Sequence, residues 1–141
     1  MLDILLKDCL YFTVSHLSRT INRMAEEAFA PTGLSPTYAF LLMLAAENPG
    51  ISQKDLCSAL NLMPSTLTRF VDKLEAKHLV FRQSEGKNSL IYLTDEGRAL
   101  QPAITEAWGT LYHKYSAVLG YDNGNELTKI IYEAAHKLDR V

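Results

Sequence analysis

Side chains that can form hydrogen bonds with nucleic acid gather near the middle of this 141-residue sequence. The densest group comprises Ser65, Thr66, Thr68, Arg69 and Lys73. Serine and threonine hydroxyls bond to phosphates and base edges, and the arginine fork pairs best with guanine. Such a group indicates a surface for reading DNA, provided that its members share one exposed face.

Apolar residues interleaved with this group predict a helix over residues 65–77. At about 100° per residue, four of them cluster on one side and must face the core. They are Leu67, Phe70, Val71 and Leu74. Arg69 then lies near the middle of the exposed face. A solvated surface helix in which Arg69 pairs with Asp72 has the same pattern, so the flanking elements have to distinguish the two interpretations.

A short helix and a tight turn precede this segment. Residues 52–55 form a capping-box-like start, with Asp55 in place of the usual glutamate, to a helix over 53–60. Residues 61–63 turn the chain, and Pro64 opens the next helix where its missing N–H costs nothing. This order is helix-turn-helix geometry. The first turn adds two candidate DNA contacts, Gln53 and Lys54.

A β-hairpin is predicted directly after the second helix. Two β-prone runs, 81–84 and 90–93, are joined by the polar, glycine-containing tip at 85–88. A hairpin in this place is a wing. Its candidate DNA contacts are Arg82, Lys87 and Asn88.

Helices are also predicted on both sides of this core. An apolar stripe with steps of four and three residues predicts a helix over 10–28, which needs a partner helix in this chain or in a second copy. Ser35 and Pro36 start a buried helix that stops at 48–50. Thr94 caps a helix that Pro102 kinks or restarts.

A last helix is predicted after residues 122–124, with an apolar face of its own. We therefore expect a mainly α (α+β) fold with three parts. They are an N-terminal dimerisation helix over 1–34, a winged helix-turn-helix core over 35–94 and C-terminal dimerisation helices over 95–141.

The net charge has to be read by segment. The chain has 14 basic and 16 acidic residues, and its formal charge of -2 argues by itself against nucleic acid. Between residues 52 and 94, however, six bases accompany four acids, whereas the remainder has eight bases and twelve acids. The basic surplus thus lies on the winged segment, where phosphate would be met.

Composition and motifs exclude several other classes. With 48% apolar and 21% charged residues the chain is not a disordered protein. Cys9 and Cys57 lack the spacing of a zinc site or disulfide framework, and the four histidines share no ligand spacing. No signal peptide or membrane-length apolar run is found, so we expect a cytoplasmic protein with no membrane partner, metal or cofactor. Enzyme motifs are absent, and the expectation is a non-enzyme.

The sequence resembles the MarR family of bacterial winged-helix regulators. The resemblance rests on the stretch Pro64–Glu75, on Leu79-Val80 and Arg82, and on Leu93-Thr94-Asp95-Glu96-Gly97, and the order of elements matches over almost the whole chain. It implies a transcriptional regulator, with repression as the expected outcome. It further implies a homodimer of interdigitating terminal helices on a pseudo-palindromic double-stranded DNA operator, with wings beside the minor groove.

Two positions depart from the family pattern. The family wing usually carries Asp-x-Arg near its tip, where this chain has Glu85-Gly86-Lys87. A pair between Glu85 and Lys87 could substitute, although lysine lacks the arginine fork. His78 stands where the family commonly has glycine, so a somewhat different helix end is expected there.

The resemblance also implies a small aromatic effector, bound where the dimer helices meet the winged core. Aromatic side chains predicted to line such a pocket are Tyr11, Phe12, His16, Tyr38, Trp108 and Tyr112. Aromatic side chains at helical spacing more often belong to an ordinary packed core, so that interpretation stands beside the effector pocket.

Two alternative functions remain open at this point. A peroxide-sensing branch of the family uses a first-helix cysteine, which Cys9 could represent, although alignment places Tyr11 at the sensing position. A winged helix can also serve as a protein-interaction adaptor without sequence-specific DNA binding. That function would favour an apolar or acidic outer face, which Arg69 and its neighbours do not provide.

Overall fold

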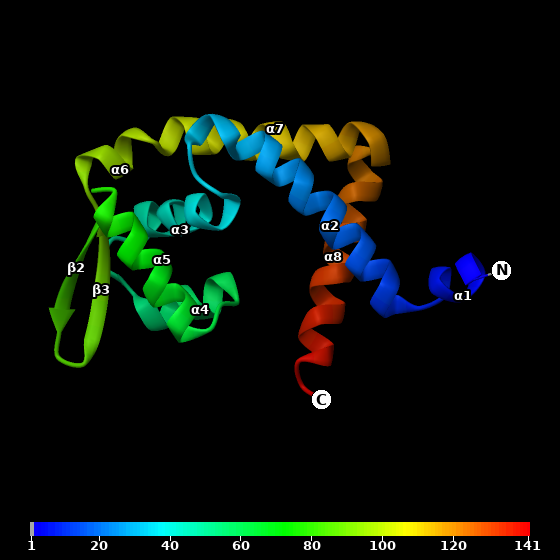
Figure 1. Ribbon diagram of the computed structural model, residues 1–141, viewed down its shortest axis with the longest axis horizontal. Helices are drawn as coiled ribbons and strands as arrows, with labels where there is room; N and C mark the ends of the chain where they lie inside the picture. Colours follow the sequence, from blue (N-terminus) through cyan, green and yellow to red (C-terminus); the bar gives the residue numbers. More distant parts are fainter. Residues whose placement is uncertain (1) are drawn as a thin grey trace.

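The computed structural model describes residues 2–141, with side chains from Leu5 onward (Figure 1). Its elements in chain order are α1 (Leu2–Lys7), α2 (Leu10–Phe29), the 3-10 turn η1 (Ala30–Thr32), α3 (Pro36–Glu47), β1 (Ile51–Ser52), α4 (Gln53–Leu60), α5 (Pro64–Ala76), β2 (Val80–Glu85), β3 (Asn88–Leu93), α6 (Asp95–Ala99), α7 (Gln101–Leu119) and α8 (Tyr121–Leu138). The predicted mainly helical fold with a winged helix-turn-helix core is confirmed.

The winged core lies at one end of the molecule and long helices extend from it. Figure 1 shows α7 running above α2, with α8 descending from the far end of α7 and the β2–β3 hairpin at the opposite edge. Helix α3 packs against both α2 and α7, and so joins the two parts. The largest fully buried side chains include Phe29, Leu41, Leu42, Leu56, Leu67 and Ile104.

A three-stranded antiparallel sheet supports the wing. Its strand order is β1-β3-β2, and Ile51 of β1 pairs with Ile91 of β3. The hairpin was predicted from its two β-prone runs and its tip. Strand β1 was not, because two residues show no alternation that could reveal a strand. It places the start of α4 beside the base of the wing.

Side-chain caps fix the ends of the helices around the wing. Ser52 Oγ accepts a hydrogen bond from the Asp55 N–H at 3.1 Å, which confirms the predicted cap of α4. Thr94 Oγ1 accepts from the Gly97 N–H at 3.0 Å and donates to the His78 carbonyl at 2.6 Å. Ser35 occupies the predicted N-cap of α3, but its side chain makes no capping bond.

The Leu-Thr-x-x-Gly motif has a steric explanation. A Cβ atom added at Gly97 would overlap the carbonyl oxygen of Leu79. Leu79 is itself held at the end of α5, because its N–H donates to the Leu74 carbonyl. Only glycine lets the first turn of α6 approach the end of α5 this closely. The motif therefore locks the base of the wing to the helix-turn-helix.

His78 ends α5 in the conformation that glycine usually supplies. Its φ is 62°, in the left-handed region. The His78 N–H bonds to the Glu75 carbonyl at 2.9 Å, and the Leu79 N–H bonds to the Leu74 carbonyl at 3.0 Å. These two bonds form a Schellman motif. Histidine in place of the usual glycine therefore leaves the hydrogen bonds of the helix end unchanged, and the difference is a strained backbone conformation at His78.

The C-terminal helices differ slightly from their predicted limits. Helix α6 ends at Ala99 and α7 begins at Gln101, so Pro102 lies in a new first turn, as expected of a proline that restarts a helix. Helix α8 begins at Tyr121, before the predicted start, because the break lies at Gly120 with φ 93°. The polar residues that suggested a loop form its first turn instead.

Apolar faces on α2 and α8 remain uncovered within one chain. On α2, Leu10 is 65% exposed and Val14 50%, and on α8, Ile130 is 54% exposed and Leu138 60%. An apolar groove between the two helices and α7 contains Tyr115, and burial together with the neighbouring Tyr112 raises the pKa of the Tyr115 phenol. A helix so exposed gains little stability from its own chain.

None of the described helices is by itself long and apolar enough to cross a membrane. The segments Leu10–Thr32 and Pro36–Glu47 reach the length and apolar composition of a membrane span only when they are taken together, and a bend of 62° separates them. The second segment belongs to the protein core, because its residues Leu41, Leu42 and Ala45 are fully or almost fully buried.

Candidate nucleic-acid interface

The exposed face of α5 carries the predicted recognition group. Leu67, Val71 and Leu74 are fully buried, as the apolar spacing predicted. Phe70 is partly buried and stacks on Tyr38 of α3 at 4.3 Å between ring centroids. On the opposite side Ser65, Thr68, Arg69 and Lys73 are exposed, and Thr66 is partly exposed. The helix therefore presents hydroxyl and basic groups to solvent from a rigidly packed backbone.

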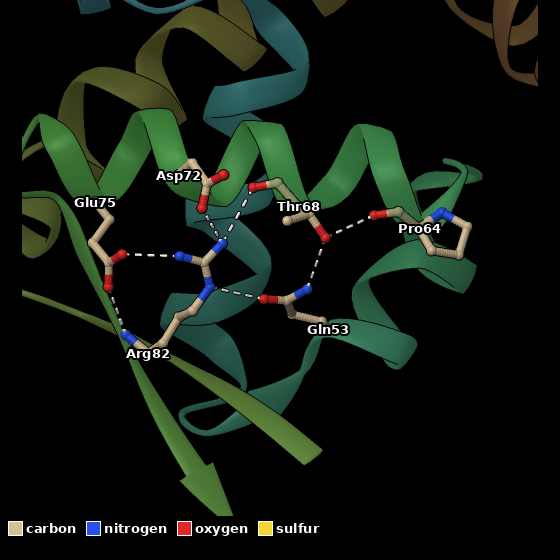
Figure 2. A network of polar contacts seen from close by, with 6 residues as sticks. All are labelled: Gln53, Pro64, Thr68, Asp72, Glu75 and Arg82. Atoms are coloured by element: carbon tan, nitrogen blue, oxygen red, sulfur yellow. Dashed lines mark hydrogen bonds and ion pairs between the residues drawn. The ribbon is translucent and has the colours of Figure 1, made fainter. Parts of the chain in front are cut away.

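Arg82 of β2 connects the wing to this face through a network of polar contacts (Figure 2). Its Nη2 atom lies 2.6 Å from Asp72 Oδ1 and its Nη1 atom 2.8 Å from Glu75 Oε1. Nη2 also donates to the Thr68 carbonyl at 3.2 Å, and Nε donates to Gln53 Oε1 at 3.0 Å. The guanidinium thus bonds to α4 and to two turns of α5 at once.

Gln53 and Thr68 belong to the same network. Gln53 Nε2 donates to Thr68 Oγ1 at 3.5 Å, and Thr68 Oγ1 donates to the Pro64 carbonyl at 3.0 Å (Figure 2). The sequence predicted DNA contacts for Gln53, Thr68 and Arg82. In the structure all three bond to other protein groups. The wing places the Arg82 guanidinium between the carboxylates of Asp72 and Glu75, which the sequence shows only as acidic residues on the helix surface.

The basic side chains left for an external ligand differ from those in the network. Within the described part of the chain, no ion pair includes Lys54, Arg69, Lys73 or Lys87, and all four are exposed. The alternative in which Arg69 pairs with Asp72 is not observed, since Asp72 pairs with Arg82. Unpaired basic groups on one surface suit phosphate and base-edge contacts.

The wing tip is a two-residue turn. Glu85 pairs with Asn88 across the hairpin, which leaves Gly86, with φ 61°, and Lys87 in the turn. Glycine with positive φ at the first of two turn positions is typical of a type II′ hairpin. Glu85 and Lys87 form no ion pair, in keeping with the small gain from a solvent-exposed pair. Within the part of the chain that the structure describes, Lys87 at the tip has no ion-pair partner.

The six predicted effector residues do not form one pocket in this chain. Tyr38 packs on Phe70 inside the winged core, and Tyr112 bonds to Asn125 at 2.9 Å near the α7–α8 corner. Phe12 and His16 line a separate hollow on α2, next to Tyr11. The aromatic character of these six residues did not reveal which helix faces contact one another, because those contacts depend on how the helices cross.

Trp108 alone of the six lines a groove between the winged core and the long helices. The groove measures about 450 Å³ and is bordered by Thr37, Phe40, Met43, Leu44, Glu47, Ala59, Leu60 and Trp108. Phe40 and Trp108 meet edge to face at 6.3 Å. Sequence reasoning missed the α3 residues because that helix is apolar nearly all round. A signal for these residues is present in the sequence, because helical spacing places four of them on one face: Thr37, Phe40, Leu44 and Glu47.

The two cysteines and the acidic residues form no evident reactive or metal site. Cys9 precedes α2, Cys57 packs against the core from α4, and both thiols are free. Among the described residues, no three His, Cys, Asp or Glu side chains gather as metal ligands would. Redox sensing at Cys9 stays an untested hypothesis.

Comparison with known proteins connects this geometry to a family. Residues 34–88 match the model of the MarR family. A curated relative, the uncharacterized HTH-type transcriptional regulator YdgJ of Bacillus subtilis (strain 168), is 36% identical over 82 residues. That alignment covers 55% of this chain and 50% of the relative, so the matched segment spans half of the relative's length.

Solved structures match over nearly the whole chain. CouR from Rhodococcus jostii RHA1 bound to p-coumaroyl-CoA has a TM-score of 0.80 and 27% identity over 92% of this chain and 94% of that one. The transcriptional repressor CouR bound to a 23-mer DNA duplex has a TM-score of 0.83 and 24% identity, with the same coverage. The family match over residues 34–88 and these likenesses agree with the sequence motifs: the chain has a winged-helix fold and is similar to the transcriptional regulators of the MarR family.

Proposed function

We propose that this protein is a sequence-specific DNA-binding regulator that acts as a homodimer on a pseudo-palindromic operator. The observation that carries this proposal is that, within the described structure, the exposed face of α5 has basic side chains without ion-pair partners, whereas its acidic side chain is paired. Arg69 and Lys73 are exposed and form no ion pair with any residue that the structure describes, while Asp72 on the same face pairs with Arg82. A helix arranged in this way offers donors to DNA and keeps its acidic groups engaged with the protein.

Helix α5 fits the role of recognition helix in the major groove. Ser65, Thr66 and Arg69 lie in its N-terminal half, which is the part that reaches base edges in helix-turn-helix proteins. Lys73 and Lys54 are suited to flanking phosphates, and Lys87 with Asn88 extends from the wing tip toward the adjacent minor groove. CouR, which shares the fold, binds a DNA duplex.

The terminal helices supply the proposed dimer interface. Residues 1–34 and 95–141 carry the apolar faces of α2 and α8 that this chain leaves exposed, and residues 35–94 form the DNA-binding core. A second copy is the simplest cover for both faces, because an exposed apolar stripe of this length is unfavourable in water. Two cores joined in this way would meet half-sites on one side of the DNA.

A small molecule bound in the groove at Trp108 would regulate DNA binding. The groove lies where α3 and α4 of the winged core meet α7, so its occupation can bias the angle between the core and the dimer helices. The structure of CouR bound to p-coumaroyl-CoA supports this proposal, since the two chains share a fold. We infer repression that such a ligand relieves.

Selection of genomic DNA fragments by the purified full-length protein tests the proposal. We expect enrichment of a palindromic sequence whose half-sites lie about one helical turn, roughly 34 Å, apart. An enriched sequence without two-fold symmetry would contradict the dimer. No enrichment over random fragments would instead favour a winged helix that serves as a protein-interaction adaptor.

A further inference from the structure

The charge around the Trp108 groove distinguishes between classes of ligand. Of its eight lining residues, Glu47 is the one charged member, and no lysine, arginine or histidine of the described chain borders the groove. Glu47 is exposed and takes part in none of the ion pairs of the described residues. A carboxylate in this position repels an anionic ligand and attracts a cationic one.

The helix ends at the groove act in the same direction. Glu47 is the last residue of α3, and Ala59 with Leu60 closes α4. Carbonyl groups in the last turn of a helix carry a partial negative charge that stabilises cations nearby. Two helix C-terminal turns therefore border the groove, in addition to the Glu47 side chain.

The walls of the groove provide aromatic faces for such a ligand. Trp108 is 51% exposed and meets Phe40 edge to face, with 86° between the ring planes. The indole face is the best cation–π partner among protein side chains. Met43 and Leu44 of α3 complete an apolar floor that suits an aromatic ring. The groove volume of about 450 Å³ lies within the range of small-molecule sites.

We propose that this groove selects a cationic aromatic ligand, an arylalkyl amine or quaternary ammonium compound, over anionic or neutral aromatics. The ring would lie against Trp108 and Phe40, with the ammonium group near Glu47 and the ends of α3 and α4. The inference rests on the proposed function only in treating the groove as the effector site.

Trp108 itself supplies the measurement, because it is the single tryptophan of the chain. Its fluorescence in the full-length protein is titrated with 2-phenylethylamine, 2-phenylethanol and 3-phenylpropionate, which share a phenylalkyl body and differ in charge. We expect quenching with a dissociation constant about tenfold lower for the amine than for the carboxylate, and with the alcohol between them.

Two glutamate variants assign the preference to the groove. Glu47→Gln should weaken amine binding about threefold and leave the binding of the alcohol unchanged. Glu106→Gln is the matched control, because Glu106 is exposed on α7 two residues before Trp108, about 200° around the helix. It should leave all three dissociation constants unchanged.

Three results would overturn the inference: tighter or equal binding of the carboxylate, the same effect from both glutamate variants, or no quenching by any compound at millimolar concentration. DNA binding of each protein is measured separately without these compounds. Loss of DNA binding would count against the proposed function, whereas intact DNA binding with any of the three results counts against the ligand inference alone.

Discussion

Arg82 Nη2 and Asp72 Oδ1 lie 2.6 Å apart, which joins the first wing strand to the exposed face of α5, the proposed recognition helix. The Arg82 side chain is only 23% exposed, and it also bonds to Glu75 and Gln53. Because the Arg82 guanidinium donates to acceptors on both α4 and α5, it fixes the rotation of α5 relative to the wing. Arg82 is therefore suited to position the groups that read DNA.

Arg82→Lys separates this positioning role from direct phosphate contact. Lysine keeps the charge but cannot bond to Asp72, Glu75 and Gln53 together, since it lacks the planar fork. We expect the ratio of operator to non-specific affinity to fall about tenfold, with the slope of log affinity against log salt unchanged. An unchanged specificity ratio in titrations at two salt concentrations would show that the network does not position α5.

Arg69→Ala tests the proposed role of α5 as the recognition helix. Arg69 is exposed and central on the outer face of α5, and it forms no ion pair among the described residues, so its loss should remove the proposed base contacts without disturbing the fold. We expect a cost of about 1–3 kcal/mol in operator binding and a relaxed preference at one position of each half-site. The check is repeated fragment selection with the variant. Recovery of the original operator would mean that another residue reads that base pair.

Lys87→Ala tests the wing tip. Lys87 lies in the two-residue turn beyond the Glu85–Asn88 pair and forms no ion pair in the described structure. We expect weaker binding to all DNA sequences and a salt dependence that falls by about one phosphate per protomer. Anisotropy titrations over a range of salt concentrations measure the slope. A selective loss for the operator alone would instead indicate base readout by the wing.

His78→Gly tests the strain at the end of α5. His78 has φ 62° and its backbone forms a Schellman motif that glycine adopts without a Cβ penalty. We expect the variant to raise the free energy of unfolding by about 1 kcal/mol. Thermal melts at matched protein concentration measure the change. Asn61→Gly is the control, because Asn61 also has positive φ, but asparagine tolerates it and should gain less.

Ile130→Glu tests the dimer interface on α8. Ile130 is 54% exposed within one chain and belongs to the apolar face with Leu127 and Ile131. A charge buried against a second copy should shift the protein from dimer to monomer and weaken operator binding. Sedimentation of the variant gives the result. Lys129→Glu, about 100° away on the outer side of α8, should leave the dimer intact.

Most of the secondary structure could be predicted because its causes are local. The apolar spacing around Leu67 and Val71 defined the buried face of α5, and both residues are fully buried. Caps at Ser52 and Thr94 were recognisable because the bonds join residues three positions apart. Glycine at position 86 indicated the wing turn through its backbone freedom alone.

The tertiary structure decided what the candidate site residues contact. Gln53 and Arg82 are 29 positions apart, and no periodicity or cap connects them. Their contact depends on β1, on the Gly97 approach to Leu79 and on the packing of α5, each a relation between distant segments. The same dependence left Tyr38 and Tyr112 outside the groove that Trp108 lines, and it placed Glu47 at that groove. The sequence by itself determined the elements and the polarity of their faces, because local spacing controls both. The orientation of whole helices and strands determined which polar groups remain available to DNA or ligand, because it brings together side chains that are far apart in the chain.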